Sequence, residues 1–595
     1  MILQSLFDYY DRRVTDPDSG IAPLGFEKKD LKFIIEIDEN GKFINLIDLR
    51  ESDKKGKYYL LPRSEGRSGT NSWHTTFLLW DHWGYVLGCP KSDTEKEKLR
   101  AARQKETFIN KIKSLPDVIK NDKGVAAVIK FYEAGQESEV MEHNSWPECR
   151  KINGCNISFK LNSDTILVPE REAVKNWVIK STDVPSSNED TIIGRCLVSG
   201  EIGEIKKTHT KFSIGGNQAA LVSCQKNSGY DSYGKEQAYN APVSVKSEFA
   251  YSTALKSLLG SEYNKTYIND LILLFWAQPK TLTAEETKEI EEKFSFFIST
   301  PYLENQNNTD NGIETVKNLF ESIKTGKMPV DMGDKFHVLG ISSNVARIVV
   351  RLWESGRISD FSEKIIDYFN DMEIDRSPKD PPYLTFKEML SSVAIDYKID
   401  KLPPNLSSSV LMSILNGMPY PATLFQHAIR RIRAERKVTR TRAAVIKAYI
   451  NRLAKRCQDK SKEVTMSLDK SNTDAAYRLG RLFAVLEKIQ EEANPGLNST
   501  IRERFYGAMS STPLTVLPML MRLKNYHLAK LDNVGRKNYF EKEIGEIIGD
   551  MQTEMLPKHL SLEKQGYFAV GYYHQRQMFF TKQNKNTDQG EKKCQ

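Results

Sequence analysis

The sequence predicts an α+β fold, in which a mixed, β-rich N-terminal region is followed by a mostly α-helical C-terminal half ending in a helical bundle. Two observations support this prediction. In the first third, apolar and polar residues alternate on both sides of Asn40-Gly41, and an Asn-Gly step between such runs is typical of a β-hairpin. After about residue 340 the strand patterns fade, and helical periodicity interrupted by proline and glycine continues towards the C-terminus.

The chain of 595 residues is too long for one hydrophobic core, since single cores usually stop growing near ~250 to 300 residues. Thr283 and Glu286 match a capping box, which indicates a helix over 283–298. Leucines at helical spacing between Ala475 and Ile489 indicate a helix that packs on other helices. We expect five parts: a β-rich domain at 1–135, a mixed α/β region at 136–335, a helical domain at 336–465, a helical bundle at 466–582 and a disordered tail at 583–595.

The cysteines and the apolar runs predict a compartment. Seven scattered cysteines, an odd number, argue against a disulfide framework and for a reducing cytoplasm. Cys149 and Cys155 are the closest pair, but no second pair follows at the spacing of a zinc site, so we expect no metal. The longest apolar run, 271–277, is far shorter than the ~20 residues of a membrane span. We therefore expect a soluble, cytoplasmic protein without membrane partners.

The sequence lacks the common catalytic and nucleotide-binding motifs. Neither a phosphate-binding Gly-x-x-x-x-Gly-Lys-Ser/Thr loop nor Gly-x-Gly-x-x-Gly, His-Glu-x-x-His or Gly-x-Ser-x-Gly is present. His209 and Cys224 could be imagined as a base and a nucleophile, but a polar residue beside an ordinary thiol is the simpler interpretation. We expect no catalytic residues and no cofactor. A nuclease with dispersed carboxylates remains the alternative.

Positive charge is concentrated between Arg430 and Arg456, where eleven Lys or Arg residues are accompanied by a single acid, Glu435. Apolar residues recur there at helical spacing, so we expect one face to pack while the cations project outwards. Such a segment is suited to phosphate contacts, which give affinity without reading sequence. A solvated basic face, or a scaffold that holds RNA only, is the alternative. The residues expected to bind phosphate are Arg430, Arg431, Arg433, Arg440, Arg442 and Arg452.

Two polar loops are candidates for contacts with nucleic acid. The loop that follows Pro62 carries short polar and basic side chains suited to base edges in a groove, namely Arg63, Arg67, Thr70, Asn71, Ser72 and His74. The stretch 227–244 offers hydrogen bonds and stacking faces through Tyr233, Lys235, Gln237 and Asn240. An ordinary surface loop and a structural turn, respectively, are the alternatives.

Four stretches together resemble the large subunit of the type I-C CRISPR interference complex (Cascade). They are "SYGKEQAYNAPVS" at 232–244, "FHVLGISSNVARIVVRLW" at 336–353, "GMPYPATLFQHAIRRIRAE" at 417–435 and "FAVGYYHQR" at 568–576. They occur in the same order as in the family and are spread over most of the chain. The loop after Pro62 departs from the family pattern, because it lacks the proline that members tend to carry there.

The resemblance implies a non-catalytic, DNA-binding subunit of an RNA-guided surveillance complex. In such complexes guide RNA pairing reads the target, while the protein reads a short protospacer-adjacent motif (PAM) and stabilises the R-loop. The loop with Arg63 to His74 would read the PAM, and a helicase-nuclease would be recruited to cut. The implied partners are guide RNA, target double-stranded DNA, and the backbone and repeat-RNA-processing subunits of the complex. The stretch 232–244 would contact nucleic acid or the neighbouring subunit that carries the RNA.

The resemblance further implies that a small subunit is translated from an internal start within this gene. Met466 stands at the beginning of the expected bundle, and Lys462-Glu463-Val464 can be encoded by AAG-GAG-GTN, a purine-rich ribosome-binding element. We therefore expect separately made copies of the C-terminal part as further partners. A domain linker with an incidental methionine is the alternative.

Overall fold

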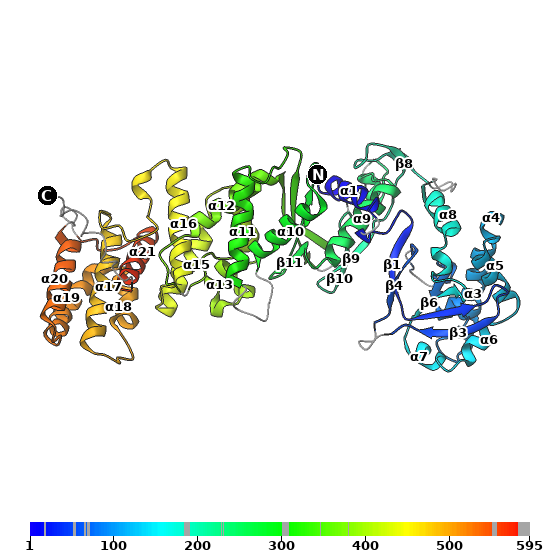
Figure 1. Cartoon of the computed structure of the whole chain (residues 1–595), viewed down its shortest axis with the longest axis horizontal. Coiled ribbons are helices and arrows are strands. Elements are labelled where there is room, and N and C mark those ends of the chain that lie inside the picture. The colour runs from blue at the N-terminus through cyan, green and yellow to red at the C-terminus, as the bar shows by residue number, and fades with distance from the viewer. Residues whose placement is uncertain are drawn as a thin grey trace, which may run out of the picture. The chain divides into compact units, whose positions relative to one another are not determined.

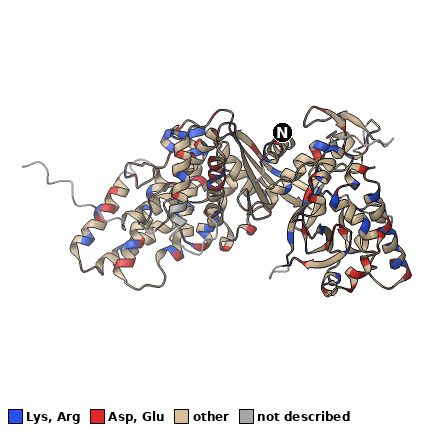
Figure 2. Cartoon of the chain, turned by 45° about the vertical axis from the view of Figure 1, so that its right-hand side comes forward, with Lys and Arg blue, Asp and Glu red and all other residues tan. Residues whose placement is uncertain are grey.

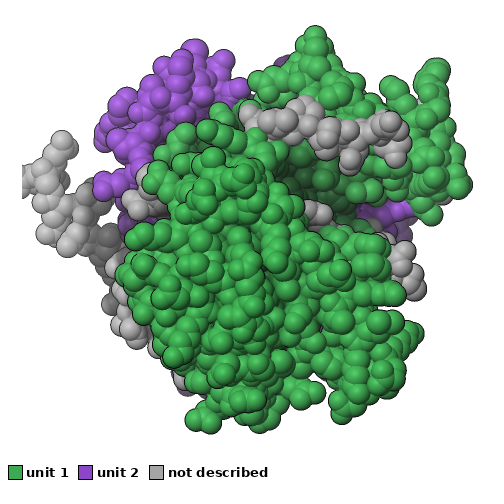
Figure 3. Space-filling model, turned by 90° about the vertical axis from the view of Figure 1, so that its right-hand side faces the viewer, with its two compact units in different colours: residues 1–211, 220–257 green, residues 212–219, 258–595 purple. Residues whose placement is uncertain are grey.

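The computed structural model describes the chain except for residues 17–18, 51–54, 65–66, 68–71, 184–190, 228, 230, 232, 300–308, 345–346, 379, 550–555 and 581–595. The described residues form two compact units (Figure 3), one of residues 1–211 and 220–257 and the other of residues 212–219 and 258–595. The α+β fold is confirmed, because every described strand ends by Arg357 and the described elements beyond it are helices (Figure 1). The units do not follow the expected boundaries at 135, 335 and 465, and the expected tail lies outside the described residues.

The first unit is built on a four-stranded sheet with the order β3-β2-β6-β5. The hairpin expected at Asn40-Gly41 is confirmed: β2 and β3 pair antiparallel, with Ile35 opposite Leu46. Gly41 has φ +80°, and a Cβ there would overlap the backbone of α5 at Ala127, so only glycine fits this turn. The parallel pairing of β2 with β6 completes the buried centre of the sheet. These elements are β2 (Phe33–Ile37), β3 (Phe43–Asp48), β5 (Trp80–His82), β6 (Asn156–Leu161), α3 (Glu95–Lys113) and α5 (Lys123–Glu133).

The rest of the first unit consists of two further pairs of strands and several helices. The antiparallel pair β1-β4 precedes the loop at Arg63, and the chain re-enters the sheet at β5. The remaining elements of the unit are α1 (Ile2–Val14), β1 (Phe26–Leu31), β4 (Lys57–Pro62), α2 (Trp83–Val86), α4 (Asp117–Lys120), α6 (Glu137–Glu142), α7 (Trp146–Lys151), α8 (Glu172–Asp183), β7 (Ile193–Arg195), β8 (Ile202–Glu204) and most of α9 (Val245–Gly260).

The second unit begins with an antiparallel sheet of the order β11-β12-β13-β14. The capping box expected at Thr283 and Glu286 is confirmed, with both of its hydrogen bonds present at the start of α10. Strand β12 is buried along almost its whole length, since α10, α11 and α12 cover the sheet. These elements are β9 (Lys211–Ile214), β10 (Asn217–Ala220), β11 (Lys265–Ile268), β12 (Leu271–Gln278), α10 (Ala284–Ile298), α11 (Thr309–Lys324), β13 (Lys335–Asn344), β14 (Arg347–Arg357) and α12 (Ile358–Met372).

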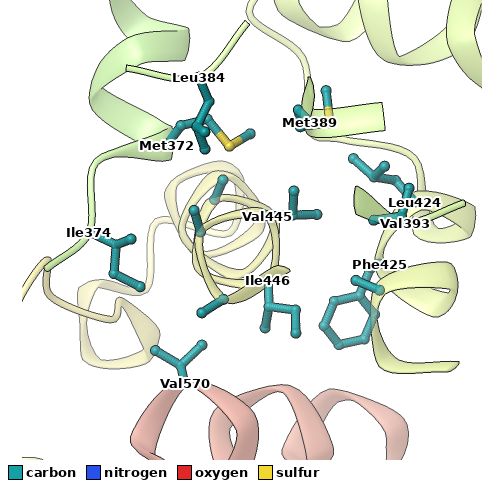
Figure 4. Packing of buried hydrophobic residues seen from close by; sticks show 14 of the residues in the cluster. Met372, Ile374, Leu384, Met389, Val393, Leu424, Phe425, Val445, Ile446 and Val570 are labelled. Carbon is teal, nitrogen blue, oxygen red and sulfur yellow. The ribbon is translucent and has the colours of Figure 1, made fainter. Parts of the chain in front are cut away.

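Helix α16 lies at the centre of the helical part. Figure 4 shows Val445 and Ile446 of this helix enclosed by apolar side chains from several other helices. Ala443, Ala444 and Ala448 are also buried, so neighbours pack against α16 on all sides. The helices of this part are α13 (Phe386–Ser392), α14 (Leu406–Leu415), α15 (Ala422–Glu435), α16 (Arg440–Arg456), α17 (Ala475–Ala493), α18 (Ile501–Met509), α19 (Pro513–Ala529), α20 (Val534–Gly549) and α21 (Leu562–Met578). Among the described residues, no helix is long and apolar enough to cross a membrane.

The buried core continues without a break across residue 466. One cluster of buried apolar residues extends from Ile268 to Tyr573 and includes the α17 seam that the sequence predicts. Helix α21 contacts α15 and α16 as well as α17, and a Cβ added at Gly566 would press against Phe425 of α15 and Ile446 of α16. The Tyr567 hydroxyl donates a hydrogen bond of 2.6 Å to the carbonyl of Lys462. The C-terminal helices therefore share their core with the helices that precede them.

Helices α17 and α21 approach each other through two glycines. A Cβ at Gly480 would overlap the carbonyl oxygen of Phe568, and one at Gly571 would overlap the carbonyl oxygen of Tyr477. Glycine in a helix interior is unfavourable by about 1 kcal/mol relative to alanine. The two glycines therefore lower the helix propensity of α17 and α21, but they allow the two helices to cross closely.

We predict that Gly571→Ala lowers the free energy of unfolding of the second unit by about 1–3 kcal/mol, because the added methyl group forces the two helices apart. Chemical denaturation monitored by circular dichroism measures the change. Gly545→Ala is the matched control: it lies on α20 with nothing within 4 Å of its added Cβ, so the protein should be unchanged or slightly stabilised. Equal effects of both variants would contradict the close crossing.

Candidate nucleic-acid interface

Arg67 is engaged inside the first unit. Its guanidinium forms a two-pronged ion pair with Asp81, which is fully buried, and its Nε donates a hydrogen bond of 2.8 Å to the carbonyl of Thr75. The same group lies between the rings of Phe77 and Tyr85, at 3.8 and 4.1 Å from their centroids. Burial raises the pKa of Asp81, and Arg67 opposes that rise. Arg67 therefore shapes the base of the loop.

Arg63 is similarly occupied by protein partners. Its Nη2 donates a hydrogen bond of 2.5 Å to Thr210 Oγ1 and lies 3.4 Å from Glu248 Oε2. Burial would raise the pKa of the fully buried Glu248, but Arg63 and hydrogen bonds from Thr210 lower it. The arginine ties the start of the loop to α9 of the same unit.

The outward part of the loop is a short aromatic and basic cluster. His74 is exposed, and its ring stacks on Trp73 with centroids 3.5 Å apart. Arg103 of α3 lies 5.3 Å from the Trp73 ring, and Arg100 donates a hydrogen bond of 3.2 Å to Ser72 Oγ. The expected residues Thr70 and Asn71 lie outside the described residues. Sequence reasoning missed Trp73, Arg100 and Arg103, although the last two stand one helical turn apart in a lysine- and arginine-rich segment.

The stretch 227–244 divides into an exposed tip and a fixed end. Tyr233 is fully exposed with φ 52°, and Lys235 is exposed beside it. The Asn240 side-chain amide instead donates to the carbonyls of Lys235 and Gln237, at 2.9 and 3.0 Å. Gln237 has φ 49° and is half-buried. Tyr233 and Lys235 are thus available to a partner, while Asn240 holds the turn.

Cys196 anchors the far end of this stretch. Burial would raise the pKa of its thiol, but hydrogen bonds from Ser244, Ser247 and the backbone at Ser199 lower it to about 6. The amide of Ser244 lies 3.3 Å from Cys196 Sγ.

His209, the candidate base of the sequence, is paired with Tyr251, with 2.6 Å between its Nδ1 and the hydroxyl oxygen. Across the described ranges, no group of three or more His, Cys, Asp or Glu residues is arranged to hold a metal ion.

The basic segment 430–456 does not point outwards as a whole. Arg442 is fully buried, with its Nε 2.8 Å from the carbonyl of Ser392 and its Nη2 2.6 Å from Glu435. Arg452 is 8% exposed and pairs with Asp371 at 2.5 Å. The expectation that these two side chains project outwards is wrong, because this part of α16 is enclosed and both guanidinium groups bind oxygens of neighbouring elements.

Of the other expected arginines, two contact protein oxygens and two are exposed. Arg440 donates to the carbonyls of Pro381 and Pro382, and burial lowers its pKa. Arg431 lies 3.8 Å from Glu435. Arg430 and Arg433 of α15 are exposed, and they line a groove of about 580 Å³ together with Arg436 and Arg504. Figure 2 shows that Lys and Arg alternate with Asp and Glu over much of the chain, so a groove lined by four arginines is a local feature.

A comparison of the sequence with models of protein families gives one match over nearly the whole chain. The family model described as "CRISPR-associated protein (Cas_Csd1)" matches residues 6–580. The chain is therefore a CRISPR-associated protein, since the match spans nearly all of it. It belongs to the Cas_Csd1 family. No curated protein gives a match to the chain.

We predict that Arg442→Gln lowers the free energy of unfolding by about 3 kcal/mol, because it leaves Glu435 and the Ser392 carbonyl without their buried donor. Arg430→Gln, the same substitution at an exposed residue, should change it by less than about 0.5 kcal/mol. Thermal and chemical denaturation of the full chain measure both. Equal stabilities would show that the buried pair adds nothing to the fold.

Proposed function

We propose that the chain is the large subunit of a type I-C Cascade: a DNA-binding subunit without enzymatic activity that recognises the PAM, stabilises the R-loop and recruits a helicase-nuclease. The family match over residues 6–580 is the observation that carries this proposal. Guide RNA, target double-stranded DNA and the other Cascade subunits are its partners in this role, and the cytoplasm is its compartment. The complex assembled with guide RNA should leave target DNA uncut in the presence of magnesium until the helicase-nuclease is added, and cleavage by the complex alone would contradict the proposal.

The loop at residues 63–74 is the PAM reader in this proposal. Glu248 holds Arg63 at the start of the loop and Asp81 holds Arg67 within it, so two points of the loop are fixed to the rest of the unit. Ser72 and His74 stand beside Arg103, whose charge suits a nearby phosphate. The exposed Tyr233 and Lys235 are assigned to nucleic acid or to a neighbouring subunit.

The C-terminal part is also proposed as a separately translated small subunit that begins at Met466. In the full chain, Val570 of α21 lies against the α16 side of the core (Figure 4). A product without α16 would expose this apolar face, so its copies would need a covering partner within the complex.

We predict that Asn71→Ala with Ser72→Ala weakens binding to PAM-containing duplex by about 1–3 kcal/mol per lost base contact, with little change for PAM-free duplex. Fluorescence anisotropy at fixed salt measures both affinities in the assembled complex. Ser114→Ala with Asn121→Ala, at exposed positions of the same unit, is the matched control. Equal losses on both duplexes would show that the loop only positions the backbone.

We predict that the natural gene with a C-terminal tag yields a second product of roughly 15 kDa, the share of 68.0 kDa that corresponds to 130 of 595 residues (466–595). Replacing Met466 by a non-start codon, or recoding 462–464 synonymously, should remove this band while the full-length band persists. Immunoblotting against the tag measures both. A full-length band alone from the natural gene would refute the internal start and leave the large-subunit proposal intact.

A further inference from the structure

The groove beside α15 is lined by arginines from two distant parts of the second unit. Arg430 and Arg433 project from α15, Arg436 follows directly as its C-cap, and Arg504 faces them from α18. Among the described residues, none of these four arginines forms an ion pair. Four unpaired guanidinium groups around one groove of about 580 Å³ repel one another, so their placement favours an anionic ligand.

The acids nearest to the groove are already occupied. Glu435 is paired with Arg442 at 2.6 Å and with Arg431 at 3.8 Å. Glu503 lies in the groove wall, but it accepts a hydrogen bond of 2.7 Å from the amide of Thr500 and pairs with Arg502 at 2.9 Å. These partners leave the positive charge of the groove without an internal counter-ion.

Two positions in the groove depart from ordinary helix preferences. Arg436 ends α15 in the left-handed region, with φ 53°, where glycine is usual and an arginine is strained. Gly507 lies within α18, where alanine would be favoured, yet a Cβ added there would meet nothing within 4 Å. The first position keeps a charge despite the strain, and the second adds no side chain to the lining of the groove.

We propose that this groove binds consecutive phosphates of one nucleic-acid strand. Guanidinium groups match phosphate oxygens in pairs of parallel hydrogen bonds, and arginines spread along a groove can contact several phosphates in turn. A volume of about 580 Å³ lies in the range of sites for small ligands, so it accepts a short stretch of one strand and not a duplex. The inference rests on the proposed function for its choice of nucleic acid over a free polyphosphate.

The site exists only in the full-length chain. Arg504 follows Met466, whereas Arg430, Arg433 and Arg436 precede it. A product that begins at Met466 would carry one arginine of the four, so separately made copies would bind a strand by other surfaces. Large and small subunits from one gene would thus differ in strand binding.

The test uses the full chain and a labelled 20-nucleotide thymidine strand, with affinity measured by fluorescence anisotropy over a range of salt. The triple variant Arg430→Gln, Arg433→Gln, Arg504→Gln should weaken binding at least about tenfold and reduce the salt slope by about 2, since each phosphate contact on a single strand contributes about 0.7. The triple variant Lys324→Gln, Lys327→Gln, Lys335→Gln is the matched control, because it removes the same charge from exposed positions of the same unit. It should leave the slope nearly unchanged.

Arg436→Gly separates binding from folding. It relieves the left-handed strain, so the melting temperature should hold or rise while strand affinity falls. Unchanged affinity and slope in both groove variants would overturn the groove proposal and leave the proposed function standing. Wild-type protein that binds neither the strand nor target duplex, alone or in the assembled complex, would refute both. Tripolyphosphate that binds the groove more tightly than the strand does would also overturn the strand assignment.

Discussion

The burial of α16 on all sides is the constraint on which the helical part of the protein depends. Cations in the enclosed part of α16 cannot reach water, so each buried guanidinium there needs oxygen partners nearby. Arg442 finds them in Glu435 and the Ser392 carbonyl, and Arg452 finds them in Asp371 and the carbonyls of Ser413 and Met418. These bonds join α16 to α12, α13, α14 and α15. Because Glu435 is paired with Arg442, the exposed arginines of α15 have no carboxylate partner among the described residues.

The opposite wall of the groove depends on a second buried charge. Glu487 of α17 is fully buried, accepts a hydrogen bond of 2.7 Å from Thr500 Oγ1 and one of 2.5 Å from the Tyr572 hydroxyl. It therefore joins α17 to the start of α18 and to α21. The glycine crossing of α17 and α21 holds Tyr572 close enough for this bond. The direction of Arg504 on α18 thus follows from core interactions that involve no groove residue.

Local features of the fold could be predicted from the sequence because they depend on neighbours in the chain. The hairpin at Asn40-Gly41, the capping box at Thr283 and the seam of α17 each follow from short-range geometry, and each is confirmed. Which arginines of the basic segment 430–456 are buried and which are exposed could not be predicted in this way. The sequence of α16 mixes apolar and basic residues, and the number of basic residues does not reveal which of them meet protein oxygens in the fold. Arg504 joins Arg430 only through tertiary packing, which no spacing along the sequence reveals.

In both units, an arginine that is paired inside the protein is not free to bind a ligand. A guanidinium whose donors are taken by protein oxygens cannot also hold a phosphate without giving up those bonds, and leaving a buried carboxylate unpaired is costly. In the first unit this applies to Arg63 with Glu248 and to Arg67 with Asp81. In the second it applies to Arg442. Shaping the protein and contacting a ligand are therefore assigned to different arginines, and the absence of an internal partner, more than the number of cations in a segment, distinguishes those that can bind nucleic acid.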